Sequence, residues 1–512
     1  FHEVALSPRA FAPTCRHHGA VYSTHVKHVA LLQCFLVARK TSPVFDPELW
    51  DHRSAKRIVT LAKEKELHKK ATEWSKYYGD PFTLWMGSRP MIVLNSYEVI
   101  KEGLVERRHD FAGRFATKLG DIQIRDDHDI VFEDYNATWK ALRKVAVTAV
   151  RKYAVSESLE NLCTEIVDAY VDSLDDEPLT VDARVPIMSI IINVLSVSAF
   201  SAKFDAKSPD LNRMMTINRT FTELAPNGLP SDIAPWLGVL YRAREKRCED
   251  LFAEIRSIVR RMYAGAKETY QPGKVLNFTH AILSARDEAL EQEKNDAEFL
   301  TEGNMVQILI DLFGAGTDTS IGELQWLLLK ISREPSIQDK IRKEIDDNIG
   351  QSPPTMKDIE RLPYTMACIM ETLRCYPIAP FGLPHKASHD SVIAGIAIPK
   401  DTRLMYNAYS VNHDPKLWVD HDVFRPERFL NPVTGTLLSK DRLPPFLSFG
   451  LGPRSCLGEK LAKADMFYVI VRLVQRLSIS APEGETGREV VPMGNSFFLF
   501  AGRQNVVLTK NC

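Results

Sequence analysis

The chain has 512 residues, of which 45% are hydrophobic and 26% are charged, and its formal net charge is −1. These values are typical of a large globular protein with an ample core, and the near-neutral charge argues against a nucleic-acid-binding protein. The eight cysteines form no Cys-x-x-Cys pair and no regular framework, which fits a reducing compartment.

The N-terminal segment differs from the rest of the chain. Residues 1–43 contain one acidic residue, Glu3, and their most apolar run, residues 29–38, is too short to span a bilayer. We interpret residues 1–71 as an atypical segment, either a degenerate membrane anchor or a targeting region, because the basic, acid-poor composition weakly resembles a mitochondrial transit peptide. No linker or repeat divides the remainder, so residues 72–512 are predicted to form one domain.

The first predicted elements are short. Residues 82–94 indicate a hairpin of two strands around a turn with Gly87 at its start, and residues 111–129 are expected to form a long polar loop. A helix is predicted to open at Trp139, which shares one helix face with Arg143 four residues later. An exposed helix with a half-buried tryptophan is the plainer interpretation of that pair.

Amphipathic helices with polar breaks are expected over residues 156–285. Residues 305–332 then predict a long apolar helix that is interrupted by a glycine- and hydroxyl-rich stretch, residues 314–320. Each glycine costs about 1 kcal/mol against alanine in a helix interior. Asp318 and Thr319 place an acid and a hydroxyl in this apolar helix, as a proton relay requires. A plain helix crossing would explain the glycines but not Asp318.

Two further segments contain charged residues that are candidates for a buried network. Glu371 and Arg374 lie three apart on one predicted helix face, and as an exposed pair they would contribute only about 0.3 kcal/mol. Residues 426–429 supply another arginine, Arg428. Between these segments, His385 precedes a strand-like hairpin that runs through Tyr406.

The chemistry of the chain is most evident in residues 449–458, which read FGLGPRSCLG. Glycines around Cys456 let the backbone turn its N–H groups toward the sulfur, and the helix predicted over residues 459–477 favours a thiolate near its N-terminus. A lone cysteine argues against zinc, whereas a single thiolate on iron suits haem. Arg454 is positioned to pair with a haem propionate. The alternative is a structural cysteine in a glycine-rich turn.

These segments, in this order, resemble the motifs of the cytochrome P-450 family over residues 72–510. The resemblance implies a mainly α-helical prism with a small β-rich region, and residues 72–512 become a single haem-thiolate catalytic domain. It also implies haem b between the helix of residues 305–332 and the loop of Cys456, which is the iron ligand. The implied reaction is monooxygenation, which inserts one atom of dioxygen into an apolar substrate.

Roles for individual residues follow from the same resemblance. Thr319 is expected to hydrogen-bond dioxygen, and Asp318 is expected to assist proton supply. The expected haem contacts, beside Cys456, are Arg454, Trp139, Arg143, His385, Ala315, Gly316, Phe449, Gly450 and Gly458. The expected structural network is Glu371, Arg374 and Arg428.

Electrons must come from outside the chain, because no flavin or nicotinamide fingerprint follows a predicted strand. We expect NADPH to supply them through a separate flavoprotein reductase, or a ferredoxin to do so. Both partners are acidic and would meet a basic face near the cysteine. The candidates for that face are Lys140, Lys144, Arg151, Lys152, Arg442, Lys460 and Lys463. A solvated surface without a partner is the alternative.

Within the family, residues 384–387, 407–418 and 426–432 resemble animal microsomal enzymes related to steroid 17-alpha-hydroxylase and the aryl hydrocarbon hydroxylases. This implies a membrane surface and the cytosolic face of the endoplasmic reticulum, with mitochondria as the alternative. Asn218 lies where the steroid enzymes carry an asparagine that binds the polar end of the steroid.

A steroid is therefore the expected substrate, and planar aromatic, xenobiotic or fatty molecules are the alternative. A haem-thiolate isomerase or dehydratase and a haem-binding sensor stay open as functions of another class. The Asp318 and Thr319 pair argues against both, since neither function needs a proton relay to dioxygen.

Overall fold

The computed structural model describes residues 36–39, 66–86, 89–153, 158–205, 208–225, 228–233, 235–292, 296–493 and 497–511. Most of the atypical segment predicted for residues 1–71 lies outside the described residues. The part that is described is strand β1 (Leu36–Arg39) and the start of helix α3 (Leu67–Tyr78).

Helices make up most of the described chain, as the sequence predicts. After α3 they are α4 (Tyr97–Lys101), α5 (Lys118–Ile124), α6 (Ala137–Tyr153), α7 (Ser158–Asp172), α8 (Arg184–Phe200), α9 (Pro209–Leu224), α10 (Pro230–Ile233), α11 (Leu237–Leu240), α12 (Arg242–Glu268), α13 (Phe278–Gln292), α14 (Glu302–Arg333), α15 (Pro335–Asn348), α16 (Pro363–Cys375), α17 (Ala408–Asn412) and α18 (Glu459–Arg476).

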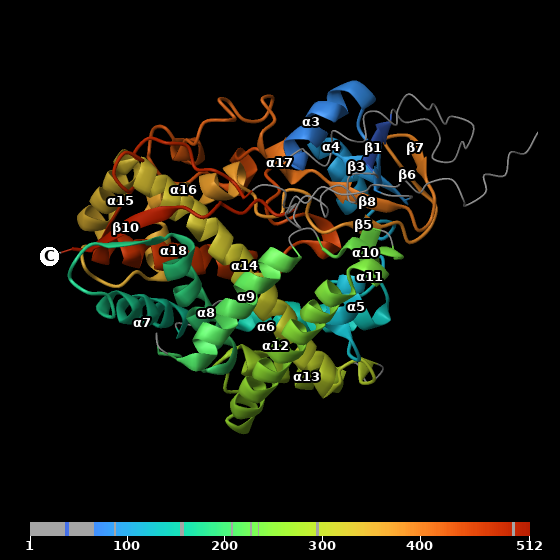
Figure 1. Cartoon of the computed structure of the whole chain (residues 1–512), viewed down its shortest axis with the longest axis horizontal. Helices are drawn as coiled ribbons and strands as arrows, with labels where there is room; N and C mark the ends of the chain where they lie inside the picture. Colours follow the sequence, from blue (N-terminus) through green and yellow to red (C-terminus); the bar gives the residue numbers. More distant parts are fainter. Residues whose placement is uncertain are drawn as a thin grey trace, which may run out of the picture.

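The strands of the described residues form small sheets at the edge of this helical body (Figure 1). One sheet has the order β1-β2-β3-β8-β5, a second the order β4-β10-β9, and β6 pairs with β7. The strands are β2 (Phe82–Met86), β3 (Arg89–Leu94), β4 (Leu179–Asp182), β5 (His385–Lys386), β6 (Ser391–Ile393), β7 (Ile396–Ile398), β8 (Arg403–Tyr406), β9 (Leu477–Ser480) and β10 (Asn505–Lys510). The pairing of β2 with β3 confirms the strands of the hairpin predicted over residues 82–94, although Gly87 of its turn lies outside the described residues. The pairing of β6 with β7 confirms a hairpin before Tyr406.

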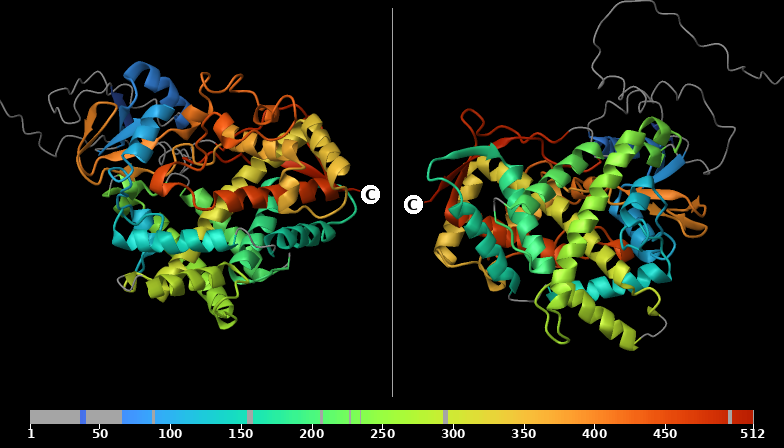
Figure 2. Two further views of the ribbon diagram at one scale, coloured as in Figure 1. Left: turned by 180° about the vertical axis from the view of Figure 1, so that it is seen from behind. Right: turned by 60° about the horizontal axis from the view of Figure 1, so that its bottom comes forward.

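Helix α14 is the central helix of the molecule. It contacts α6, α8, α12, α16 and α18, and its two ends are buried in the main hydrophobic core. Its 32 residues span about 48 Å at 1.5 Å per residue. Seen from behind, α18 in red and α6 in cyan come to the front of the molecule (Figure 2).

The predicted interruption of α14 does not occur, because the helix is continuous through residues 314–320. Two hydroxyls in this stretch bond backward along the helix. Thr317 donates to the carbonyl of Phe313 at 2.6 Å, and Thr319 donates to the carbonyl of Ala315 at 2.6 Å. Packing on both sides of the stretch keeps the helix regular despite the cost of its glycines.

One other expectation was wrong and one was incomplete. The loop predicted over residues 111–129 contains α5, because Thr117 caps its first turn by accepting a hydrogen bond from Gly120 N at 3.0 Å. Residues 156–285 are mostly helical, as predicted, but they also contain β4, which pairs with β10 in a register that joins Val181 to Val506. A strand whose partner lies more than 300 residues away leaves little local signal.

Candidate active site

The loop around Cys456 is held in a tight fold by glycines. Gly450 and Gly452 have φ values of +69° and +72°, a region that favours glycine. A Cβ on Gly452 would lie 1.9 Å from the carbonyl oxygen of Leu104, and one on Gly450 would lie 2.7 Å from the hydroxyl of Tyr406. Cys456 N donates to Phe449 O at 2.8 Å, which closes the loop.

The thiol of Cys456 ends this loop just before α18 begins at Glu459. The surface of the Cys456 side chain is accessible to solvent. The protein atoms around the thiol nevertheless desolvate it in part, and this raises its pKa. The backbone N–H groups of Gly458 and Glu459 and the Arg143 guanidinium act in the opposite direction and favour the thiolate. Gly458 therefore contributes a backbone donor, as expected for a metal-ligating sulfur.

The middle of α14 is open where its ends are buried. Gly314 and Ala315 are exposed, and a Cβ on Gly314 would meet no atom within 4 Å. A Cβ on Gly316 would lie 3.5 Å from Leu195 of α8. Because α14 packs against α18, which follows Cys456, this open stretch and the thiol belong to neighbouring elements of one core.

Basic side chains converge beside the cysteine loop. Arg454 donates from Nε to Ala112 O at 2.9 Å and from Nη2 to Glu133 O at 2.7 Å, while its buried Nη1 has no hydrogen-bond partner among the described residues. Burial and the neighbouring Arg114 and Arg143 lower the pKa of the Arg454 guanidinium to about 8. An anion against Nη1 would relieve that repulsion.

Arg114 is a member of this cluster that the sequence analysis missed. It is buried and donates from Nη1 to Pro384 O at 2.7 Å and to Leu383 O at 3.2 Å. Burial of His385, followed by the charge of Arg114, holds the pKa of the imidazole well below its usual range. The Nδ1 atom of His385 is hydrogen-bonded to Phe111 O at 2.7 Å. The arginine of the Phe-Ala-Gly-Arg segment was the available signal, but its partners lie about 270 residues away.

These donors fit the cofactor that the sequence implies. Haem carries two propionates, and three guanidinium groups with one unpartnered buried N–H provide the charge and the hydrogen bonds that carboxylates require. Asp129 and Asp134 are the nearby acids, and both partly offset the cluster.

Trp139 and Arg143 occupy one side of this region, and each already donates a hydrogen bond to a backbone carbonyl. Trp139 is buried and donates from Nε1 to Ile130 O at 3.1 Å, and Arg143 donates to Ser455 O. The Trp139 ring lies under the Arg454 guanidinium at 4.0 Å from its centroid. Trp139 thus orients Arg454 by stacking.

Asp318 and Thr319 have different hydrogen-bond partners. Its carboxylate accepts a hydrogen bond from Asn218 Nδ2 at 2.7 Å and lies 3.5 Å from Arg184 Nη2, which also donates to Asn218 Oδ1 at 3.2 Å. Burial raises the pKa of Asp318, while Arg184 and Asn218 lower it. The structure thereby joins Asp318 to a residue predicted to contact substrate, and adds Arg184, which no motif had indicated.

Glu371, Arg374 and Arg428 are brought together. Arg374 forms a bidentate pair with Glu371 at 2.7 and 2.9 Å, both side chains are fully buried, and Arg428 Nε lies 3.0 Å from Glu371. Arg374 also donates to Asn412 O at 2.7 Å, and Asn412 accepts from Leu447 N at 2.8 Å, two residues before Phe449. The network therefore reaches the cysteine loop through Asn412.

The predicted basic face is partly paired within the chain. Lys152 is paired with Glu288 of α13, and Lys463 with Glu459 at 2.6 Å. The Lys140 ammonium lies 4.6 Å from the centre of the Tyr135 ring. The remaining residues of the predicted basic face, Lys144, Arg151, Arg442 and Lys460, are exposed.

Within the described part of the chain, none of the helices combines the length and the apolar character that crossing a bilayer requires.

Comparison with known proteins supplies the family. The family model described as Cytochrome P450 matches residues 56–499. Steroid 17-alpha-hydroxylase/17,20 lyase of Papio cynocephalus is 29% identical over 429 residues, which cover 83% of this chain and 84% of that protein. Cytochrome P450 1A5 of Gallus gallus is 31% identical over 442 residues, which cover 83% and 82%.

The fold has a solved counterpart. A zebrafish cytochrome P450 determined with progesterone superposes with a TM-score of 0.74 at 27% identity, over 86% of this chain and 99% of that one. A family match that spans most of the sequence, together with a shared fold, shows that the chain belongs to the cytochrome P450 family of haem-dependent monooxygenases.

Proposed function

We propose that the protein is a steroid hydroxylase with activity like that of steroid 17-alpha-hydroxylase. The observation that supports this most is the shared fold with a zebrafish cytochrome P450 determined with progesterone. The relatives named as steroid 17-alpha-hydroxylase/17,20 lyase, which align over four fifths of the chain, support it as well. Planar aromatic, xenobiotic and fatty molecules are the competing substrate class, and the experiment below separates them.

The cofactor-binding residues are proposed from their chemistry. When bound, haem supplies the electron-transfer and dioxygen chemistry of the family. Cys456 would be its thiolate ligand, and Arg114, Arg143, Arg454 and His385 would surround its propionates. Phe449, Gly450 and Gly458 would shape the loop against it, and Ala315 and Gly316 would leave room for it beside α14.

The proton-handling residues are Asp318 and Thr319. The raised pKa of Asp318 lets its carboxyl hold a proton at higher pH than an exposed aspartate does, and Arg184 and Asn218 fix its position. The Thr319 hydroxyl is oriented by its bond to Ala315 O and retains its acceptor lone pairs. We assign proton supply to the pair.

Asn218 is proposed to meet the polar end of the steroid. An amide offers two N–H donors and two acceptor lone pairs, and the bonds to Asp318 and Arg184 use one of each. A donor and an acceptor are therefore free for a carbonyl or hydroxyl of a substrate. The Arg184 guanidinium also lies 5.3 Å from the centre of the Phe500 ring, which adds an apolar wall.

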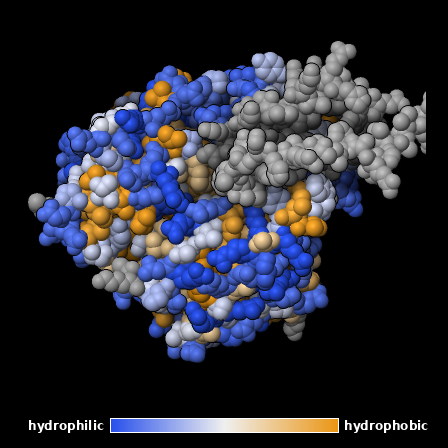
Figure 3. All heavy atoms as spheres, in the orientation of Figure 1, coloured by the Kyte–Doolittle hydropathy of each residue, from blue (hydrophilic) through white to orange (hydrophobic). Residues whose placement is uncertain are grey.

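A membrane-bound flavoprotein reductase that uses NADPH is the proposed electron donor, and the cytosolic face of the endoplasmic reticulum is the proposed location. Apolar side chains of α11 and the turn before it are exposed, namely Trp236, Val239 and Leu240. Hydrophobic surface gathers over α10 and α11 in Figure 3, as on a protein that rests on a bilayer. The exposed Lys140, Arg442 and Lys460 are proposed to attract the acidic reductase.

The test is a titration of the purified ferric protein with progesterone, followed by haem absorption. A saturable low-spin to high-spin change in the haem spectrum is expected if the pocket beside the haem accepts a steroid. No change with progesterone, but a change with a planar aromatic or a fatty acid, would contradict the steroid proposal. The thiolate signature after reduction and addition of carbon monoxide is the control, and its loss in Cys456→Ser checks the ligand.

A further inference from the structure

An open groove with a volume of about 490 Å³ lies between α12 and the residue that follows α5. Four of its lining side chains are arginines, Arg125, Arg256, Arg260 and Arg261, and Ser257 lies among them. Arg256 and Arg260 are four residues apart on one face of α12. Arg125 comes from the other wall, directly after α5, so two separate segments supply the cations.

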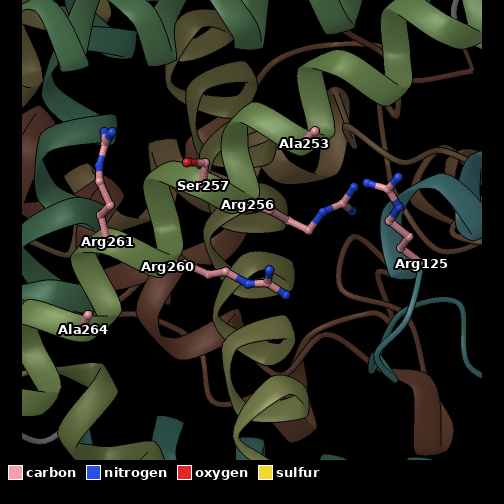
Figure 4. A pocket seen from close by; sticks show the side chains of 7 residues that line it. All are labelled: Arg125, Ala253, Arg256, Ser257, Arg260, Arg261 and Ala264. Atoms are coloured by element: carbon pink, nitrogen blue, oxygen red, sulfur yellow. The ribbon is translucent and has the colours of Figure 1, made fainter.

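The guanidinium groups are directed into one space. Figure 4 shows the ends of Arg125 and Arg256 pointing toward each other, with Arg260 beside them and Arg261 turned to the other side. Guanidinium groups are positively charged, so their approach to one another in this groove is repulsive. Arg125 holds its position with a φ of +56°, a conformation that non-glycine residues rarely adopt.

Acidic side chains compensate only part of this charge. Asp127 lies 3.4 Å from Arg260, and Asp210 lies 3.6 Å from Arg261. Over the described residues, no carboxylate lies within ion-pair distance of Arg125 or Arg256. The nearby Asp126 and Asp127 act on Arg256 only from further away.

Arg256 is the buried arginine of the groove. It is 7% exposed, and its Nη1 donates to Ile122 O at 3.0 Å and Gln123 O at 2.9 Å, which are neutral carbonyls of the last turn of α5. Burial, and then Arg125 and Arg260, lower the pKa of Arg256, as expected for a cation that lacks a counter-charge. Arg125 is exposed and has no carboxylate within ion-pair distance among the described residues, and Arg260 is exposed but is paired with Asp127 at 3.4 Å.

From these contacts we propose that the groove between α5 and α12 binds the phosphate group of an organic phosphate, held mainly by Arg125, Arg256 and Arg260. Guanidinium groups match phosphate oxygens in pairs of parallel hydrogen bonds, and three of them from two walls suit a multiply charged anion better than a carboxylate. The groove has a volume of about 490 Å³ and is open to solvent, so the organic part of the ester can extend outward from it.

The phosphate could belong to a soluble ester or to a lipid headgroup. The vesicle experiment below separates the two sources.

Calorimetric titration of the full-length haem-loaded protein with inorganic pyrophosphate, at physiological ionic strength, tests the proposal. We expect one saturable site per chain. The double variant Arg125→Gln/Arg260→Gln should weaken binding at least about tenfold, because charge-assisted hydrogen bonds are lost. The control Arg242→Gln/Arg247→Gln removes two exposed charges from the same helix outside the groove and should bind as the wild type does.

Equal affinity in all three proteins, or no saturable binding by the wild type, would overturn the proposal. Vesicles of phosphatidylcholine, with and without phosphatidylinositol phosphate, identify the source. Recruitment that the double variant loses and the control keeps assigns the groove to a lipid headgroup, and pyrophosphate binding without recruitment assigns it to a soluble ester. Neither readout involves substrate turnover, so failure here leaves the steroid proposal untouched.

Discussion

At the scale of single residues, two buried glutamates have opposite surroundings. Glu371 is fully buried and makes charge-assisted bonds to Arg374 and Arg428. Glu323 of α14 is also buried, but it accepts only one hydrogen bond, from Ile378 N at 3.2 Å, and its Oε2 has no partner among the described residues. Burial accordingly raises the pKa of Glu323 from 4.5 to about 8.

The raised pKa of Glu323 makes the stability of the protein depend on pH. Below pH 4.5 the carboxyl is neutral in both the folded and the unfolded chain, and as pH rises toward 8 only the unfolded chain releases the proton. The wild type therefore loses stability across this window. Glu323→Gln stays neutral and should gain free energy of unfolding relative to the wild type by up to about 1.4 kcal/mol per pH unit.

Urea unfolding at both ends of the window measures this difference. The exposed Glu291→Gln on α13 is the control and should show no such trend. A constant difference between Glu323→Gln and the wild type at all pH values would mean that Glu323 is ionised in the folded protein.

At the scale of the element, the glycines of the long helices differ in how closely other side chains approach them. A Cβ on Gly322 of α14 would lie 2.6 Å from Ile378 Cδ1 and 2.9 Å from Phe500 Cδ1. Ile378 can turn its terminal methyl away, but the Phe500 ring is rigid and also supports Arg184. Gly322 thus permits close packing beside the Asp318 cluster. By contrast, a Cβ on Gly265 of α12 would meet nothing within 4 Å.

Alanine at these two positions should shift stability in opposite directions. Gly322→Ala is expected to lower the free energy of unfolding by about 1–2 kcal/mol, since overpacking exceeds the gain in helix propensity. Gly265→Ala should raise it by about 0.5–1 kcal/mol. Urea midpoints of the two variants decide the matter, and a shift of the same sign in both would contradict the role of Phe500.

At the scale of the whole molecule, sequence patterns predicted the elements that depend on interactions between residues close together in the chain. The long apolar run of α14 and the glycine loop with α18 behind it were visible because their signals lie within a few residues. Arg184 and Arg114 were not, since their partners Asp318 and Pro384 are 134 and 270 residues distant. Strand β4 was missed for the same reason, and α5 was missed because its single cap lies in a polar stretch.

The proposed membrane attachment concerns the whole molecule, and the exposed residues of α11 allow us to test it. Val239 and Leu240 are 81% and 62% exposed. Burial of such a side chain in a bilayer contributes about 1.5–3 kcal/mol. Val239→Asp/Leu240→Asp should therefore reduce co-sedimentation with phosphatidylcholine vesicles more than tenfold. Val433→Asp, at a position 91% exposed and far along the chain, is the control, and an equal loss in both variants would assign binding to another surface.

The contact between Asn218 and Asp318 makes two properties of the active site thermodynamically linked. A ligand that draws Asn218 away removes a bond that stabilises the carboxylate, so it favours the protonated acid. By reciprocity, protonation of Asp318 must favour that ligand by the same factor. If Asn218 contacts the substrate as proposed, substrate affinity and the protonation of Asp318, though measured by different methods, report one coupling free energy between α9 and α14.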